Sequence, residues 1–282
     1  RHLCSSQGDD PEECRIILCA PTGQAAFNIG GSTNHKAFKI PPHKGMNYTR
    51  LNADLLNSVQ TKYRHLSVVI MDEVSMVGNK QFSFIHQRLQ EIKGNKKPFG
   101  GVHMILVGDL HQLRPVKDSW IFSDLTGQYG PLATNLWKEY FTMHTLTVIM
   151  RQKDDQAFAQ ALNRLRTGHH TNEDIAWFKT RMIDPSDAQY PRLVQHIFPE
   201  NIPANNYNAL VFATCTTEKK TVKAIDSVVG DFTPDVKERI KSRISKKASD
   251  TASLLHEVDI ALDRRYEIVT NLTVEDGMTN GA

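Results

Sequence analysis

Two short apolar runs in the sequence each end in an acidic motif, and this pairing limits the folds that the chain can adopt. The first motif is MDEVSM at 71–76, after the run LSVVIM, and the second is GDLHQLRPV at 108–116, after VHMILV. Runs this short and this rich in Val and Ile are typical of strands buried on both faces of a parallel sheet. Because open α/β sheets bind ligands beyond the carboxyl ends of their strands, both motifs should line one crevice. The expected lining side chains are Asp72, Glu73, Asp109 and Gln112.

Length and composition place few limits on the class of protein. The 282 residues suffice for one large or two medium domains, and 40% hydrophobic with 23% charged residues is ordinary for a globular chain. A net charge of +3 permits a polyanionic partner without requiring one. The four cysteines form no Cys-x-x-Cys pair and are expected to be reduced thiols of an intracellular protein. No apolar stretch approaches the roughly 18 residues of a membrane span, so no membrane partner is expected.

The order of predicted elements is that of a doubly wound α/β protein. The run RIILCA at 15–20 predicts a strand, and PTGQAAFNIGGSTNHKAF at 21–38 predicts a turn and a helix, which together make a βα unit. Residues 39–64 are mixed and predict no element. Further strands are predicted at 66–71, 102–107, 208–215 and 264–272. Helices are predicted at 80–92 and 156–166, and a third from a capping box at Thr171–Asp174 to about Met182. Residues 235–264 have a charged, helix-like pattern.

Carboxylates at a strand end suit the chemistry of a magnesium-bound nucleotide. In the motif at 71–76, Asp72 could hold the Mg²⁺ that bridges the phosphates, and Glu73 could orient or deprotonate the attacking water. In the second motif, Gln112 could sense the γ-phosphate. The alternatives are structural, because Asp72 could simply cap the following helix and Gly108-Asp109 could simply form a turn.

A third segment and one arginine suggest contacts to phosphates. Thr22, Gly23 and Thr33 offer hydroxyl and backbone donors at a loop and helix start, where phosphates are favourably held. His35 and Phe38 could stack on an unpaired base, although Phe38 could equally belong to the core. Arg151, after an apolar run, could stabilise charge during phosphoryl transfer or could be a surface arginine.

In this order, the motifs resemble those of the PIF-one-type DNA helicases, including the helicase parts of Helitron transposons. APTGQAAFNIGGSTNH at 20–35 resembles the family segment APTGxAAxxIxGxTxH, and MDEVSM resembles its Walker B motif. GDLHQLRPV resembles the segment Gly-Asp-x-x-Gln-Leu-x-Pro-Val. LTVIMRQKDDQAFAQALNRLRTG at 146–168 and NLTVEDGMTNGA at 271–282 resemble the family's Leu-x-x-x-x-Arg-Gln and Asn-Leu-x-x-x-x-Gly-x-x-Asn-Gly stretches.

The resemblance implies a fold and a partition into domains. The fold would be α/β, with RecA-like P-loop NTPase domains built on parallel sheets. Residues 1–145 would form a first domain without its phosphate-loop strand, and 146–282 a partial second domain that runs into its insertion. Both domains would therefore be incomplete, as in a fragment of a longer protein.

The resemblance also implies an activity and a role for each site residue. Asp72 would hold Mg²⁺, Glu73 would activate water, and Gln112 and Arg151 would contact the phosphates of ATP. The activity would be ATP-dependent unwinding of single-stranded or forked DNA with 5′-to-3′ movement, by a monomer in the nucleus or mitochondrion. It would serve DNA damage repair, recombination and telomere maintenance. The residues implied to contact nucleic acid are Pro21, Thr22, Gly23, Thr33, His35 and Phe38.

The sequence departs from the family pattern at a few positions and lacks one motif. Gln24 stands where the family usually has Lys, Lys36 where Ser is common, and Arg114 where a first Pro is usual. No Gly-x-x-x-x-Gly-Lys-Ser/Thr occurs in the 282 residues. That loop holds the phosphates with its amides and its Lys, so the isolated chain is expected to bind ATP poorly and not to unwind DNA.

Two other functions compete with this interpretation. One is a non-hydrolysing module, derived from a helicase, that binds single-stranded nucleic acid; an unaltered activity after Glu73→Gln would favour it. The other is an unrelated P-loop enzyme such as a nucleotide kinase, which explains the segment around His35, the Gln112 motif and Arg151 poorly.

Overall fold

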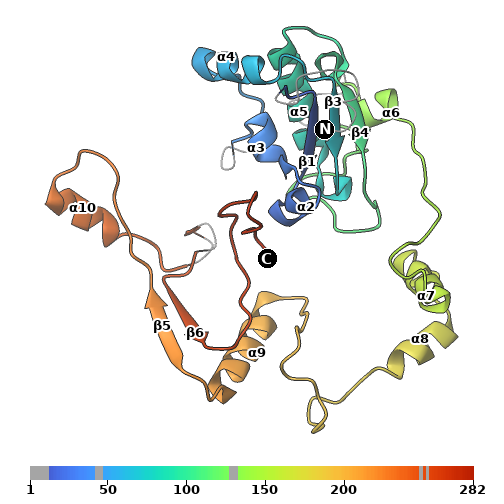
Figure 1. Cartoon of the computed structure of the whole chain (residues 1–282), viewed down its shortest axis with the longest axis vertical. Helices are drawn as coiled ribbons and strands as arrows, with labels where there is room; N and C mark the ends of the chain where they lie inside the picture. The colour runs from blue at the N-terminus through green and yellow to red at the C-terminus, as the bar shows by residue number, and fades with distance from the viewer. Residues whose placement is uncertain (1–12, 42–46, 127–132, 248–249, 252–253) are drawn as a thin grey trace. The chain divides into compact units, whose positions relative to one another are not determined.

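The chain folds into two units in the computed structural model, which describes residues 13–41, 47–126, 133–247, 250–251 and 254–282. Unit 1 comprises Arg1–Ile149 together with Asn271–Ala282, and unit 2 comprises Met150–Thr270. Each unit is described by itself below (Figure 1). The domain boundary between 145 and 146 stays a sequence-based prediction.

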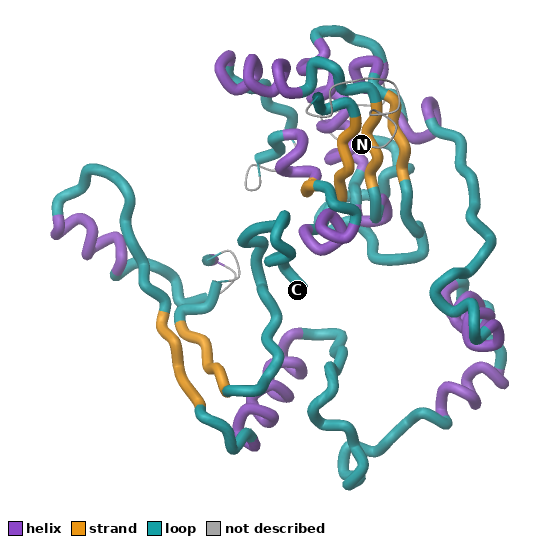
Figure 2. Tube along the Cα trace, in the orientation of Figure 1, coloured by secondary structure: helices purple, strands orange, loops and turns teal. Residues whose placement is uncertain are grey.

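A parallel sheet of four strands forms the centre of unit 1. Its strands are β1 (Ile16–Ala20), β2 (Ser32–Thr33), β3 (Val68–Met71) and β4 (His103–Leu106), in the order β2-β1-β3-β4. All three pairings are parallel, and Figure 2 shows the three longer strands side by side. The predicted α/β fold with a parallel sheet is confirmed, and the strands predicted at 15–20, 66–71 and 102–107 are present.

The core of unit 1 lies on one face of this sheet. Alternate strand residues such as Ile17, Cys19, Val69 and Met71 are buried there. The same cluster contains side chains from α3 (Asn34–Phe38), α4 (Ala53–Lys62) and α5 (Asn79–Lys93). Burial in this apolar cluster raises the pKa of the Cys19 thiol to about 12, so Cys19 is an un-ionised core residue.

The prediction that both acidic motifs follow strands buried on both faces is wrong, because β3 alternates between half-buried and buried residues and β4 is more exposed still. β4 is the last strand in the sheet order, and its residues alternate between exposed and half-buried. Ile105 is 49% exposed. The apolar run before the second motif is therefore a strand with one well-packed face, which a continuous run of apolar residues does not distinguish from a fully buried strand.

The remaining elements of unit 1 are short. They are α2 (Gly23–Asn28), the 3₁₀ turns η1 (Val74–Met76) and η2 (Pro98–Gly101), and α6 (Leu136–Tyr140). The predicted helix at 80–92 is confirmed as α5, whereas α4 lies in the stretch at 39–64 where no element was predicted. The side chain of Asn52 caps α4 by accepting a hydrogen bond from the amide of Leu55, at 2.9 Å.

A buried arginine joins α5 to the segments that surround it. The Arg88 side chain is 1% exposed and forms an ion pair with Glu91 one turn further along the helix. Its Nε donates to the carbonyl oxygen of Phe38 at 3.1 Å, and its Nη2 donates to that of Thr49 at 2.9 Å. The guanidinium carbon also lies 5.1 Å from the ring centroid of Tyr48. The Glu91 carboxylate, the two carbonyl oxygens and the Tyr48 ring surround the guanidinium. They provide partners for N–H donors that burial would otherwise leave unpaired.

Replacement of Arg88 by alanine should strongly destabilise unit 1. The change leaves the Glu91 carboxylate without its buried partner, which costs about 3–5 kcal/mol of unfolding free energy. Urea denaturation followed by tryptophan fluorescence measures the loss, and Arg50→Ala is the control because Arg50 is exposed. Equal stability of the two variants would show that the ion pair and its hydrogen bonds do not hold α5 in place.

Unit 2 contains four helices and an antiparallel strand pair among its described residues. They are α7 (Gln156–Arg166), α8 (Asn172–Lys179), α9 (Asn201–Thr214), β5 (Lys219–Lys223), α10 (Pro234–Lys241) and β6 (Glu257–Ala261). Long loops join several of them (Figure 2). In the described ranges of both units, no helix combines the length and the apolar character that crossing a bilayer requires.

The first two helices of unit 2 confirm the pattern at 156–166 and the predicted capping box. Thr171 accepts a hydrogen bond from the amide of Asp174 and donates its own amide to the carboxylate of Asp174. Two nitrogens of Arg164 also bond to that carboxylate, at 2.7 and 2.6 Å, and hold the pKa of Asp174 well below its usual range. The Asp174 carboxylate therefore caps the N-terminus of α8 and bonds it to Arg164 of α7.

Two predicted strands of unit 2 are wrong. The run NALVFATC at 208–215 lies in α9 up to Thr214, because an apolar run of this length fits a helix as well as a strand and the flanking Asn and Ala residues extend the helix. The stretch at 264–272 is not a strand. β6 ends before it, Asp263 adopts a left-handed conformation, and the Tyr266 hydroxyl accepts from the amide of Ala261 at 2.5 Å. The chain folds back on itself there.

Candidate functional site

The two acidic motifs touch at one edge of the sheet of unit 1. The amide of Val107 donates to the carbonyl of Met71 at 2.8 Å, and the amide of Val74 donates to the carbonyl of Val107 at 3.1 Å. Gly108 lies so close that a Cβ on it would be 2.7 Å from the nitrogen of Val74. Since only glycine fits at this distance, the first residue of the second motif is determined by contact with the first motif.

Asp72 and Glu73 lie directly after β3 and are both half-buried. The amide of Asp72 donates to the carbonyl of Cys19 at 2.9 Å, so this turn also borders the end of β1. Glu73 donates its own amide to the Asp72 carboxylate at 2.8 Å. Its backbone is left-handed, with φ 51° and ψ 44°. A non-glycine residue in this conformation costs about 1–3 kcal/mol, and such residues cluster at functional sites.

The conformation of Glu73 can be tested with two truncations. Glycine adopts left-handed dihedral angles without steric cost, so Glu73→Gly should be more stable than Glu73→Ala by about 1 kcal/mol. In an ordinary β-region position the order would be reversed. Thermal and urea unfolding of both variants measures the difference, and a higher stability of the alanine variant would contradict the left-handed turn.

The second motif forms a tight turn beyond β4. The Asp109 carboxylate accepts from the amide of His111 at 3.0 Å, and the Asp109 carbonyl accepts from the amide of Gln112 at 2.9 Å. Gln112 is exposed. The turn therefore presents the Gln112 side chain to solvent, and the proximity of Gln112 to Asp72 and Glu73 stays a prediction.

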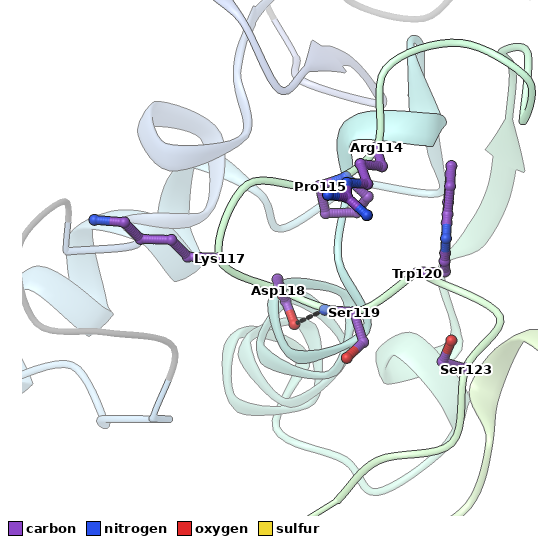
Figure 3. A pocket seen from close by; sticks show the side chains of 7 residues that line it. All are labelled: Arg114, Pro115, Lys117, Asp118, Ser119, Trp120 and Ser123. Atoms are coloured by element: carbon purple, nitrogen blue, oxygen red, sulfur yellow. Dashed lines mark hydrogen bonds between the residues drawn. The ribbon is translucent and has the colours of Figure 1, made fainter.

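A shallow cavity of about 370 Å³ lies beyond this turn (Figure 3). Its lining is Arg114, Pro115, Lys117, Asp118, Ser119, Trp120 and Ser123. Figure 3 shows the Asp118 carboxylate accepting from the amide of Ser119, at 2.8 Å. None of the predicted site residues lines this cavity, so we place the candidate site at the sheet edge and not here.

Asp118 has a structural task that explains its position. Its second carboxylate oxygen accepts from the amide of Gln81 at 3.3 Å, in the first turn of α5. The residue before α5 is Gly78, which has no side chain to cap the helix, and a Cβ there would meet the Asp118 carboxylate at 2.0 Å. The loop after the second motif thus supplies the cap of the helix that follows the first motif.

Two threonines begin the helices next to the acidic motifs. Thr22 caps α2 by accepting from the amide of Ala25 at 3.2 Å, and Thr33 caps α3 by accepting from the amide of Lys36 at 3.3 Å. Both hydroxyl oxygens are used as acceptors, which leaves each hydroxyl proton to donate to a ligand. Both threonines therefore cap a helix, and this structural role is compatible with a binding role.

The other predicted nucleic-acid contacts are placed differently. Pro21 and His35 are half-buried, and burial lowers the pKa of the His35 imidazole, which favours its neutral form. Gly23 is buried beneath Asn271. Phe38 has no exposed surface and belongs to the core, so the prediction that it stacks on a base is wrong. A phenylalanine at the end of a short helix gives no sequence signal that separates the two roles.

Arg151 belongs to unit 2, where it lies exposed in a turn before α7. Sequence reasoning missed two side-chain contacts within unit 1. Gln24 accepts from the Thr279 hydroxyl at 2.7 Å, and Lys36 forms an ion pair with Glu275. The available signal was that the sequence departs from the family pattern at Gln24 and Lys36.

The sheet edge fits a magnesium ion that arrives with phosphates. Across the described ranges, no three or more His, Cys, Asp or Glu side chains gather into a metal cage. Mg²⁺ is commonly bound through only one or two carboxylates together with phosphate oxygens and water. Asp72, whose carboxylate accepts from the amide of Glu73, offers one carboxylate of that kind.

Comparison with known proteins identifies the family. The family model of PIF1-like helicases matches residues 10–175, which is more than half of the chain. The chain belongs to the PIF1-like helicase family. Over 280 residues it is 29% identical to the ATP-dependent DNA helicase PIF1 of Emericella nidulans, covering 96% of this chain and 34% of that protein. The Pif1 helicase of Bdellovibrio bacteriovorus is 28% identical over 222 residues, 77% of this chain and 47% of that protein.

Solved structures of the family support the fold. The Pif1 helicase from Candida albicans superposes with a TM-score of 0.63 at 21% identity, covering 99% of this chain and 59% of that one. A Bacteroides Pif1 helicase in complex with ADP-AlF3 and ssDNA gives 0.51 at 24% identity, over 75% and 51% of the two chains. The chain spans 34% of the length of the Emericella nidulans helicase and 47% of that of the Bdellovibrio bacteriovorus helicase. Membership in the family removes the alternative of an unrelated nucleotide kinase.

Proposed function

We propose that this chain supplies the magnesium-binding and water-activating carboxylates and the single-strand contacts of an ATP-dependent DNA helicase. The observation that carries the proposal is the contact of Gly108 with the backbone of Val74, which joins the two acidic motifs at one sheet edge. The segment from Pro21 to His35 begins at the adjacent strand end, because β1 pairs with β3. This neighbourhood of strand ends supports a proposal in which the nucleotide and the nucleic acid bind at the same end of the sheet.

Hydrolysis would use the side chains of this edge in distinct roles. Glu73 accepts a proton from the water that attacks the γ-phosphorus, as the bond to the β-phosphate oxygen breaks. Gln112 contacts the γ-phosphate from the neighbouring turn, and Arg151 of unit 2 stabilises the charge that develops on the phosphates. Asp72 would hold Mg²⁺, which neutralises charge on the phosphate oxygens when bound.

Nucleic-acid binding would use the start of α2 and of α3. The hydroxyl protons of Thr22 and Thr33 donate to phosphates, Pro21 and Gly23 shape the backbone on either side of Thr22, and His35 packs on a base. Known relatives support DNA as the partner, since they are named ATP-dependent DNA helicases and the Bacteroides structure contains ssDNA. We extend the proposal to 5′-to-3′ movement on single-stranded or forked DNA by a monomer, in repair, recombination and telomere maintenance in the nucleus or mitochondrion.

The role of His35 can be measured by binding. Alanine at position 35 should cost about 1–3 kcal/mol of binding free energy for a labelled oligothymidylate, because one stacking contact is lost. His103→Ala is the matched control, since His103 is exposed on β4. Fluorescence anisotropy at low salt gives both dissociation constants. Equal affinities of the two variants would remove His35 from the interface, and absence of binding by the unmodified chain would contradict the proposed function.

ATP hydrolysis by the 282 residues alone should stay near background. They contain no Gly-x-x-x-x-Gly-Lys-Ser/Thr, and without that loop the β- and γ-phosphates lack their amide donors and lysine. Phosphate release with and without oligothymidylate tests this, with Glu73→Gln as the blank. DNA-stimulated hydrolysis that Glu73→Gln lowers by about 10²–10⁴-fold would overturn the expected inactivity while supporting the role of Glu73.

A further inference from the structure

The segment Asn271–Ala282 packs on α2 and α3, more than two hundred residues away in the sequence. Thr279 is fully buried there, and its hydroxyl donates to the Gln24 side chain at 2.7 Å. Asn271 lies so close to Gly23 that a Cβ on Gly23 would be 2.0 Å from its Oδ1, and the same oxygen accepts from the amide of Asn280 at 2.9 Å. The contacts at both ends of the segment fix its position on unit 1.

Between these contacts, Glu275 reaches the side chain of Lys36. The Lys36 ammonium and the Glu275 carboxylate form an ion pair in which both side chains remain more than half exposed. The hydrogen bond from Lys36 also holds the pKa of Glu275 below its ordinary value. Lys36 directly follows His35, and its amide bonds to Thr33. Its charge therefore lies among the proposed nucleic-acid contacts.

The exposure of this pair makes the carboxylate replaceable. An exposed ion pair contributes only about 0–1 kcal/mol, so separating it costs little. A phosphate offers lysine the same kind of anionic oxygen as a carboxylate. Because the neighbouring contacts of Asn271 and Thr279 hold the segment on unit 1, Glu275 stays close to Lys36 and competes at a high effective concentration.

Two neighbouring helices bond to the segment 271–282. Gln24 of α2 bonds to the buried Thr279, and Lys36 of α3 pairs with the exposed Glu275. The positive charge therefore lies at the exposed part of this contact.

We propose that Lys36 is a phosphate-binding residue for single-stranded nucleic acid and that Glu275 is the competing anion which the nucleic acid displaces. This inference rests on the proposed function and deepens it, because it names a further binding residue and an intramolecular competitor that sets its affinity. Binding then exchanges one ion pair for another, with Glu275 returning to solvent.

Anisotropy titrations with labelled oligothymidylate test the exchange. Glu275→Gln should tighten binding about two- to fivefold at low salt, since the competitor is lost. Lys36→Gln should weaken binding and lower the slope of log affinity against log salt by about 1, because one phosphate contact disappears. In the Lys36→Gln background, Glu275→Gln should give no tightening beyond that of the control.

The control is Asp276→Asn, which removes one negative charge from the exposed neighbouring residue. Equal tightening by Asp276→Asn and Glu275→Gln would overturn the inference, because the effect would then be one of net charge alone. An unchanged salt slope in Lys36→Gln, with binding by the unmodified chain intact, would overturn the inference and leave the proposed function standing. No binding by the unmodified chain would overturn both.

Discussion

Parallel backbone pairing of β3 with β1 on one side and β4 on the other determines the arrangement of unit 1. In this register Cys19 lies opposite Met71, and Met71 lies opposite Leu106. The three strands therefore stop along one line, and the residues that follow each of them emerge at the same edge. A shift of one residue in either pairing would turn the packed face of a strand toward solvent and separate the two acidic motifs. The hydrophobic alternation of the strands thus positions the polar chemistry.

The helix α5 connects this edge to the rest of the core. Its first turn is capped by Asp118, from the loop after the second motif, and Arg88 further along it bonds to the end of α3. The left-handed turn at Glu73 lies between β3 and this helix. Surroundings that are held from several sides can maintain a costly backbone conformation, which an isolated loop would relax.

Sequence reasoning succeeded where a pattern has a single local cause. The strands before Asp72 and Gly108, the helix α5 and the capping box at Thr171 each follow from periodicity or from a side chain that bonds to its own backbone. The adjacency of the two acidic motifs also follows, because it depends only on the strand ends of a parallel sheet.

The sequence-based predictions were wrong where contacts between distant parts of the chain determine the local structure. The run at 208–215 has the composition of a strand, but no strand among the described residues pairs with it, and it continues a helix. Phe38 could have faced solvent or the core, and only the packing of α3 on the sheet resolves this. The bonds of Gln24 and Lys36 to residues near 280 were inaccessible, because no local pattern predicts contacts over such a separation.

Because Asn271–Ala282 packs with the first 149 residues, unit 2 is an insertion attached to unit 1 by two strands of chain. Both ends of unit 2 are fixed to unit 1, so residues 150–270 form a closed loop. The conformational entropy lost on closing such a loop grows only slowly with the number of residues in it. A single peptide cleavage near Met150 would open that loop and still leave Arg151 and its helices covalently joined through residue 270. After that cleavage the two units would remain joined by a single segment of chain.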